Sequence, residues 1–275
     1  VFNIFPSPGI PPFGPPGVAQ LTYSIVDLTL NGGMGAVMPG SAHILLDNNI
    51  GNYMDIVPDD QCNLWLLVQS GTIHTFDFRA YRITTQGVSM TPVVSPQGFL
   101  ASAVPSFPSG IDNRSGQMIY SYTRDKIFTS YNAGDLYAFD FNPATGVVSN
   151  PQSLGWNYAP SNTQSPGLPG ICLSPDEKLL YTSGYTFGSR FELRQYPIIT
   201  SGNNVNLGQP VHVFNTSSVQ YVGVQQQTGF AWSESDLQRG PDNKVYVALN
   251  MGQDSLGVID QPNQPGLACN FNPQA

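Results

Sequence analysis

A short turn followed by an apolar strand recurs four times along the chain, and this repeat limits the fold more than any other feature of the sequence. The copies are, in chain order, Pro58–Val68, Thr123–Ser130, Ser174–Thr182 and Gly240–Ala248. If their aromatic residues Trp65, Phe128, Tyr181 and Tyr246 are equivalent, the spacings are roughly 63, 53 and 65 residues. A polar turn, an apolar strand and a second strand ending near Gly are typical of a four-stranded antiparallel blade. The interval is longer than the usual blade of about 40 to 50 residues, but the order of elements predicts a β-propeller.

Proline and glycine support an all-β fold. The 24 Pro and 28 Gly are spread along 275 residues and leave little room for long helices. No apolar period near 3.6 residues is sustained, whereas alternating runs such as Thr22–Leu28 are common. Because all-β folds of this length often form one domain, we predict a single domain over residues 1–275. Its blade-like units are expected at about 21–50, 52–95, 99–154, 168–214 and 229–272.

Two glycine-rich or proline-rich segments have simple interpretations. The turn Asn31–Gly35 lies between the predicted strands Leu21–Leu30 and Ser41–Leu46 and opens no helix, so we predict a hairpin turn and not a phosphate site. Residues 6–17 form a Pro/Gly loop, which is either a stiff surface connection or a projecting contact for a partner. Long polar inserts at 102–115, 156–167 and 217–229 account for the length of the repeat.

The charge of the chain excludes some partners. Only 10% of the residues are charged, and the formal net charge is −8. A nucleic-acid-binding protein needs a basic surface, and docking on anionic lipid needs one too. No run of about 18 apolar residues could cross a membrane. We therefore predict no nucleic-acid partner and no membrane insertion, and a neutral polar surface of the kind that is common outside the cell.

The three cysteines, Cys62, Cys172 and Cys269, are far apart and form no Cys-x-x-Cys pair. This excludes a zinc ribbon and a redox motif. At least two of them are expected to be buried small apolar residues. Alternatively, Cys269 pairs with a cysteine outside the printed sequence. The abrupt start Val1–Phe5 reads as a strand and leads us to expect a piece of a longer precursor.

Several segments resemble one family over nearly the whole chain and in the same order. They are Tyr23–Gly35, Asn63–Val68, Phe76–Gly87, Pro92–Ser95, Ser174–Asp176, Leu237–Ala248, Leu256–Asn263 and Gly266–Phe271. These segments are similar to the WD-repeat-like β-propeller domains of large secreted Bacteroidota proteins, those associated with gliding motility or carrying a type IX secretion sorting domain. One departure is Gln69, where that family usually has His.

The resemblance implies a propeller of four-stranded antiparallel blades that is truncated at both ends relative to the family. It also implies export by the type IX secretion machinery and a place at the cell surface or outside the cell. A disulfide between Cys269 and the missing region would follow from it. It carries over no catalytic residues, because no residue set with a chemical role is known for the family.

The residues themselves give weak signals for chemistry. His43, His74 and His212 form no metal-ligand pattern, and a Gly-x-Ser-x-Gly elbow is absent. We therefore predict no catalytic site, no metal and no cofactor. The carboxylates of the repeated turns are expected to support their own backbone, with Ca²⁺ binding as the alternative; they are Asp59, Asp60, Asp176, Glu177 and Asp242.

One pair of acids suits glycoside hydrolysis better than the others: Glu234 and Asp236, beside Trp232. They are equally readable as rim residues. The candidate binding residues are the aromatic residues in or near the inserts, which suit sugar rings or protein partners: Trp156, Tyr158, Tyr185, Phe187, Tyr221, Phe230 and Trp232. The other interpretation of these residues is that they cap the propeller core.

The sequence thus leads us to expect a non-enzymatic extracellular module for adhesion, assembly, or the binding of protein or glycan at the cell surface. Two alternatives stay open. One is a propeller enzyme of the lactonase or glycoside hydrolase type, and the other is a structural filament or spacer subunit.

Overall fold

The computed structural model describes residues 2–6, 19–51, 53–72, 75–97, 116–131, 136–155, 170–186, 190–215, 236–248 and 256–274. In this part of the chain, strands dominate, and the helical elements are the short 3-10 turns Asn31–Gly33 and Gly266–Cys269. No helix within these ranges has the length and apolar character needed to span a membrane.

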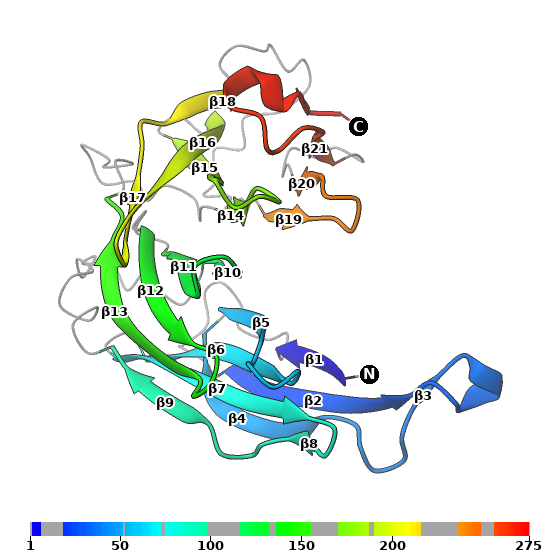
Figure 1. The fold of residues 1–275 in the computed structure, drawn as a ribbon. Helices are drawn as coiled ribbons and strands as arrows, with labels where there is room; N and C mark the ends of the chain where they lie inside the picture. Colours follow the sequence, from blue (N-terminus) through cyan, green and yellow to red (C-terminus); the bar gives the residue numbers. More distant parts are fainter. Residues whose placement is uncertain are drawn as a thin grey trace, which may run out of the picture.

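The described strands form five antiparallel sheets that follow one another along the chain and lie around an open arc (Figure 1). The first sheet contains β1 (Phe2–Pro6), β2 (Ala19–Asp27), β3 (Ala36–Val37) and β4 (Ile44–Ile50). The second contains β5 (Met54–Pro58), β6 (Leu64–Thr72), β7 (Thr75–Thr84), β8 (Gly87–Val88) and β9 (Val93–Pro96). The third contains β10 (Met118–Ser121), β11 (Lys126–Ser130), β12 (Leu136–Asn142) and β13 (Val147–Ser153).

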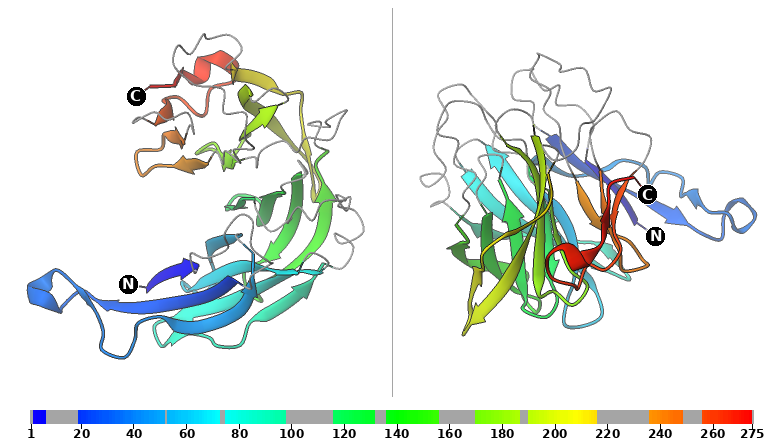
Figure 2. Two further views of the ribbon diagram at one scale, coloured as in Figure 1. Left: turned by 180° about the vertical axis from the view of Figure 1, so that it is seen from behind. Right: turned by 90° about the horizontal axis from the view of Figure 1, so that it is seen from above.

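The fourth sheet contains β14 (Gly170–Leu173), β15 (Leu179–Thr186), β16 (Arg190–Ser201), β17 (Asn204–Leu207) and β18 (Val211–Asn215). The fifth contains β19 (Leu237–Arg239), β20 (Val245–Val247), β21 (Gly257–Ile259) and β22 (Phe271–Asn272). In the last four sheets the first strand, which we call the inner strand, faces the inside of the arc (Figure 2).

The prediction of an all-β chain with antiparallel sheets in a propeller-like arrangement is confirmed. The first, third and fifth sheets have four strands each. The second and fourth have five, because two short strands pair with different parts of one long strand: β8 and β9 with β7, and β17 and β18 with β16. The described residues do not close a ring, so the number of blades and the truncation stay predictions. The predicted hairpin after β2 is present, but the returning segment splits into β3 and β4.

The repeated turns differ in length, since the backbone bonds that close them join residues four apart in Asp59–Asn63 and Gly240–Lys244 and five apart in Ser174–Leu179, but they share one feature. One residue in each turn has a positive φ: 62° at Cys62, 49° at Asp125, 55° at Glu177 and 63° at Asn243. The predicted equivalence of the aromatic residues holds in the strand register, where the pairs are Val57–Trp65, Ile119–Phe128, Cys172–Tyr181 and Gln238–Tyr246. The sequence repeat therefore corresponds to a repeat of inner strand, turn and second strand.

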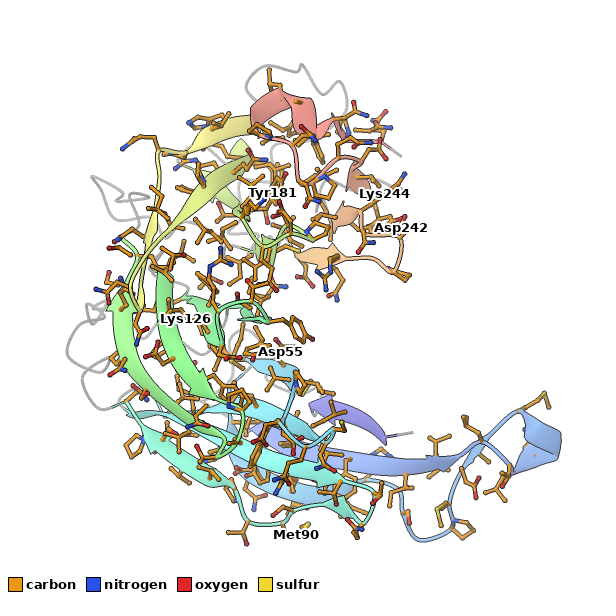
Figure 3. All side chains as sticks on the ribbon, in the orientation of Figure 1. Asp55, Met90, Lys126, Tyr181, Asp242 and Lys244 are labelled. Atoms are coloured by element: carbon orange, nitrogen blue, oxygen red, sulfur yellow. The ribbon has the colours of Figure 1, made fainter. Side chains whose placement is uncertain are left out.

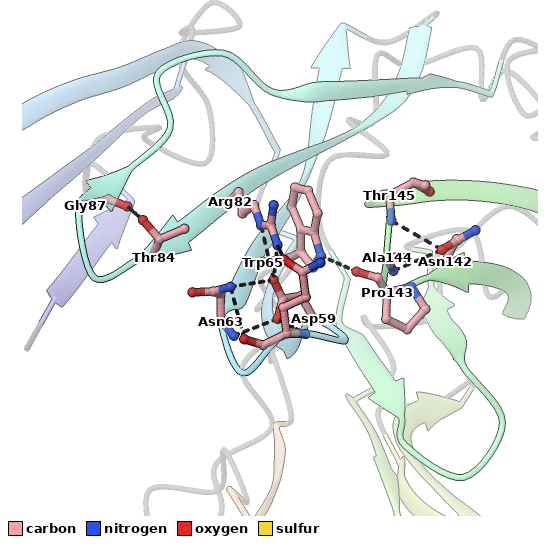
Figure 4. A network of polar contacts seen from close by, with 11 residues as sticks. Asp59, Asn63, Trp65, Arg82, Thr84, Gly87, Asn142, Pro143, Ala144 and Thr145 are labelled. Carbon is pink, nitrogen blue, oxygen red and sulfur yellow. Dashed lines mark hydrogen bonds and ion pairs between the residues drawn. The ribbon is translucent and has the colours of Figure 1, made fainter.

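Aromatic residues on the second strands hold neighbouring sheets together. Trp65 packs between the second and third sheets, and its indole nitrogen donates to the Pro143 carbonyl at 2.8 Å (Figure 4). Tyr181 packs between the fourth and fifth sheets, and its hydroxyl donates to the Pro262 carbonyl at 2.8 Å. In both residues the ring packs into the apolar core between two sheets, and its polar atom donates a hydrogen bond to the next sheet.

The burial of two cysteines and the role of Asp59 agree with the sequence prediction, whereas the prediction that Glu177 supports its own backbone is wrong, because its carboxylate bonds to the third sheet. Cys172 and Cys269 are buried, and Cys62 is exposed. Asp59 accepts hydrogen bonds from the backbone N–H groups of Gln61 and Asn63 in its own turn. Although burial opposes ionisation, bonds from the Arg82 guanidinium and from Asn63 hold the pKa of Asp59 well below its usual range.

Glu177 links the turn of the fourth sheet to the third sheet. Its buried carboxylate accepts hydrogen bonds from the Ser121 hydroxyl at 2.7 Å, the Tyr122 N–H at 2.9 Å and the Thr123 N–H at 3.0 Å. Burial opposes the charge, but these donors hold the pKa of Glu177 below its usual value of 4.5. The ionised form therefore stabilises the fold above that value, and this contribution is lost as the pH falls through the lowered pKa.

We predict that Glu177→Gln lowers the free energy of unfolding by about 1–3 kcal/mol at pH 7, because the Ser121 hydroxyl and the Tyr122 and Thr123 N–H groups lose a charged acceptor. At pH 3 the difference from the unmodified chain should shrink, since Glu177 is then closer to neutral. Urea unfolding at both pH values measures this, with the exposed Asp60→Asn as the control. An equal loss at the two pH values would contradict the charged role.

Candidate functional site on the inner strands

Three of the four inner strands carry a polar side chain at one equivalent position, and the other carries glycine there. The position lies two residues before the inner-strand partner of each repeated aromatic residue. The four residues are Asp55, Gln117, Gly170 and Asp236, and we call them the girdle. Backbone pairing confirms the alignment, since they lie opposite Leu67, Ser130, Ser183 and Ala248, respectively. Because the inner strands line the inside of the arc (Figure 2), the girdle lies there as well.

Gln117 joins three sheets at this level. Its side-chain N–H donates to the Leu237 carbonyl at 3.0 Å, and its side-chain oxygen accepts the Ile171 N–H at 2.6 Å. The equivalent residue of the fourth sheet is Gly170, which has no side chain to stand between the third and fifth sheets. At this level the side-chain amide of Gln117 bonds to both neighbouring sheets, and the fourth sheet contributes only backbone.

Asp55 is a carboxyl group held in a fixed orientation. One oxygen accepts the Ile56 N–H at 2.8 Å, and the other accepts the Tyr120 N–H of the third sheet at 2.9 Å. Burial raises the pKa of Asp55 to about 6, although both hydrogen bonds act in the opposite direction. Figure 3 shows Asp55 on the inner side of the arc. A carboxyl group of this pKa can both take up and release a proton near neutral pH.

The second acid of the girdle is Asp236. Burial around its carboxyl raises the pKa of Asp236, against hydrogen bonds from the Leu237 N–H and the Gln117 side chain, while the residue as a whole is exposed. Burial also raises the pKa of the nearby Cys172 thiol to about 12, so this sulfur is not a thiolate near neutral pH. The chemistry available at this level is therefore proton transfer by carboxyl groups.

The two histidines that the structure describes are both exposed, and no cluster of metal-ligand side chains is found among the described residues. His43 is exposed, and His212 is half exposed with its imidazole 3.6 Å from Glu192, whereas His74 lies outside the described residues. These ranges contain no group of three or more His, Cys, Asp or Glu side chains that could hold a metal ion. Gln69, where the resembled family has His, is buried and donates to the Tyr131 hydroxyl at 2.9 Å.

Most of the sequence-predicted binding residues cannot be compared with the girdle. Trp156, Tyr158, Phe187, Tyr221, Phe230 and Trp232 lie outside the described residues, and Tyr185 is described only as part of the backbone of β15. Of the predicted acid pair, Glu234 lies outside the described residues and Asp236 belongs to the girdle. The sequence interpretation missed Asp55 and Gln117. Aligning the inner strands on the repeated turn would have placed Asp55 and Asp236 in one column.

Comparisons with known proteins find likeness in structure alone. No protein-family model matches the chain, and no curated protein sequence matches it. Among solved structures, it is similar to NanB in complex with Optactamide, with a TM-score of 0.46 and 10% identity over 86% of this chain and 33% of that one. This chain thus spans about a third of that protein.

Two other similar structures are named as enzymes. The periplasmic gluconolactonase PpgL of Pseudomonas aeruginosa matches with a TM-score of 0.44 and 14% identity, over 90% of this chain and 76% of that one. A luciferin-regenerating enzyme matches with a TM-score of 0.41 and 17% identity, over 89% of this chain and 72% of that one. At these TM-scores and identities, neither activity transfers to this chain.

The expectation that the chain is not an enzyme is corrected by these matches. It rested on the absence of a recognisable catalytic motif in an all-β sequence. Chains with names such as gluconolactonase and luciferin-regenerating enzyme are among the structures it matches, so this architecture gives no ground for excluding catalysis. The girdle supplies the physical reason, because Asp55 and Asp236 lie on separate inner strands and form no local sequence motif.

We predict that Gln117→Met, which keeps the side-chain length and removes the amide, lowers the free energy of unfolding by about 2 kcal/mol, because the Ile171 N–H and the Leu237 carbonyl lose their partner. Gln20→Met is the matched control, since Gln20 is exposed and its side chain bonds to Asn48 at the surface. Denaturant unfolding measures both. Equal, small effects would show that the bridge contributes nothing to stability.

Proposed function

We propose that the chain is a hydrolase whose proton-transfer group is Asp55, acting on a neutral, oxygen-rich ring compound with a lactone-type ester. The observation that carries the proposal is the position of Asp55: an oriented carboxyl group on an inner strand with its pKa raised to about 6. Strongly shifted pKa values of this kind favour a functional group over a purely structural one.

The chemistry assigned to Asp55 is general-base catalysis. In its ionised form the carboxylate takes a proton from a water molecule, and the water oxygen bonds to the lactone carbonyl carbon. The ring C–O bond then breaks, and the proton passes from Asp55 to the leaving alkoxide, which leaves a hydroxy acid. Two backbone N–H bonds fix the carboxylate, and each oxygen keeps a lone pair for the water.

Two properties of the chain select the substrate class. The net charge of −8 disfavours anionic substrates, so a neutral compound is expected. A glycoside hydrolase needs two carboxyl groups at a defined separation, whereas lactone hydrolysis needs one base. Of the two acids of the girdle, Asp55 is the one whose two carboxyl oxygens both accept backbone N–H groups and whose pKa is raised to about 6. This arrangement favours the lactone.

The cellular setting that we propose is extracellular, at the surface of a bacterium. It is supported by the low share of charged residues, 10%, and by the segments that resemble secreted propeller domains. Labelling of intact source cells with an antibody against the chain tests it: surface labelling supports this setting, and labelling only after lysis contradicts it.

We predict that kcat/KM for neutral sugar-acid lactones rises with pH through an apparent pKa of about 6, and that Asp55→Asn lowers it at least 100-fold. Aryl glycosides run in parallel serve as the comparison substrates. Asp60→Asn is the control, because Asp60 is an exposed turn carboxylate. No turnover of any lactone, or an unchanged rate in Asp55→Asn, would overturn the proposal.

Asp55→Asn should also stabilise the protein above pH 7. Because the pKa is higher in the folded state than in the unfolded state, ionisation of Asp55 costs stability as the pH rises from about 4 to 6. With about 1.4 kcal/mol per pKa unit and one N–H bond lost to the new amide, the expected gain is about 1–2 kcal/mol at pH 8. Thermal unfolding at pH 8 and pH 3 measures it. A loss of stability at pH 8 would mean that Asp55 is only a structural acceptor.

A further inference from the structure

The hairpin that joins β2 to β3 projects away from the arc of sheets (Figures 1 and 2). Its turn is Asn31–Gly33, and all three residues of the turn are exposed. The turn contains the one Asn-Gly pair of the 275-residue sequence, Asn31-Gly32. Because glycine has no Cβ to shield its backbone nitrogen, that nitrogen can approach the side-chain amide of the preceding asparagine closely. This pair is therefore a candidate site for a covalent change of the chain.

The hydrogen bonds of this turn do not involve the two groups that would react. The φ angles are 53° at Asn31 and 68° at Gly32, a left-handed turn that the pair Asn-Gly favours. The turn is closed by the Gly33 N–H, which donates to the Leu30 carbonyl at 3.1 Å. Among the described residues, no hydrogen bond is made by the Asn31 side chain or by the Gly32 N–H. A Cβ placed on Gly32 would meet no atom within 4 Å, so the space around the pair is open to water.

Other asparagines with the same backbone conformation lack this combination of features. Those with a positive φ in the part of the chain that the structure describes are Asn150, Asn243 and Asn270. They are followed by proline, which has no N–H, and by lysine and phenylalanine, whose side chains shield the backbone nitrogen. The amide of Asn150 also donates to Asp140 at 2.7 Å. The amide of Asn270 donates to Asp260 at 3.2 Å. Of these asparagines, Asn31 alone joins an unbonded amide to a following glycine.

We propose that Asn31 is a site of spontaneous deamidation in the folded protein. The Gly32 nitrogen gives up its proton to hydroxide and bonds to Cγ of Asn31, and the Cγ–Nδ2 bond breaks with release of ammonia. Water then opens the resulting cyclic imide at one of its two carbonyl carbons. The product has either aspartate at position 31 or isoaspartate, in which the backbone continues through the side-chain carbon. One water is consumed and one ammonia is released, and nothing is oxidised or reduced.

Either product adds one negative charge to a segment that has none. Between Asp27 and Asp47 the sequence contains no Asp, Glu, Lys or Arg. Exposed apolar side chains lie in the same hairpin, among them Met34 at 80% and Val37 at 46%. A charge on an exposed turn has little effect on stability, so the change would alter the surface of the hairpin and not the fold. Because no enzyme is needed, the extent of the change would record the age of the chain.

The test incubates the folded chain at pH 9 and pH 6 and then cuts it with an endoproteinase that cleaves before Asp. This releases residues 27–46, a peptide that contains Asn31 and no other Asn or Gln. We expect the peptide to gain about 1 Da with time, faster at pH 9 because the attacking nitrogen must lose its proton. Asn31→Gly, which suits the positive φ, should abolish the gain. Residues 60–76, with Asn63 before leucine, form the internal control and should not change.

Two results would overturn the proposal. The first is no gain of mass in the folded chain under conditions in which a synthetic peptide of residues 27–46 gains it, since the turn would then protect Asn31. The second is an equal gain in residues 60–76, which would mean that the site is not selective. The fragments also identify the product, because aspartate at position 31 creates a new cleavage site and isoaspartate does not. An unchanged Tm of Asn31→Asp supports an effect on the surface alone, and a lowered Tm contradicts it.

Discussion

The bridge made by Gln117 is the interaction on which the arrangement of the inner strands depends. A buried N–H or carbonyl without a partner costs more than a normal hydrogen bond contributes, so the strands of an arc must satisfy one another across sheet boundaries. Gln117 does this for the Ile171 N–H and the Leu237 carbonyl with one side-chain amide. Trp65 and Tyr181 act in the same way further from the inside of the arc, since each donates a side-chain hydrogen bond to a carbonyl of the next sheet, at Pro143 and Pro262.

The same arrangement accounts for the chemistry that we assign to Asp55. Strands that press together on the inside of the arc exclude water from their side chains, and exclusion of water raises the pKa of a carboxyl group. In the third sheet the girdle residue is Gln117, and its amide forms a structural bridge. In the second sheet it is Asp55, whose pKa is raised to about 6. The cost of keeping this acid ionised is a loss of stability, which is the usual trade between stability and activity.

Much of the fold follows from the sequence, because each blade is a local unit with its own turn chemistry. Each repeated turn needs one residue with a positive φ, at Cys62, Asp125, Glu177 and Asn243, and this explains why the turns are rich in small or polar residues. The strands follow from the alternation of apolar and polar residues along the sequence. The girdle was not predictable in the same way. Asp55 gains its properties from the third sheet, 65 residues away at Tyr120, and no local pattern encodes such a contact. The predicted aromatic binding residues lie outside the described residues, apart from the backbone of Tyr185 and its strand.

The most direct test of this account is the titration of the Asp55 carboxyl carbon by ¹³C NMR, assigned by comparison with Asp55→Asn. The account predicts a midpoint at about pH 6, well above that of the exposed Asp60 carboxyl measured in the same spectra. A midpoint near 4 would show that the inside of the arc does not exclude water from Asp55. Asp55 would then be an ordinary surface acid, and the proposed base would be lost.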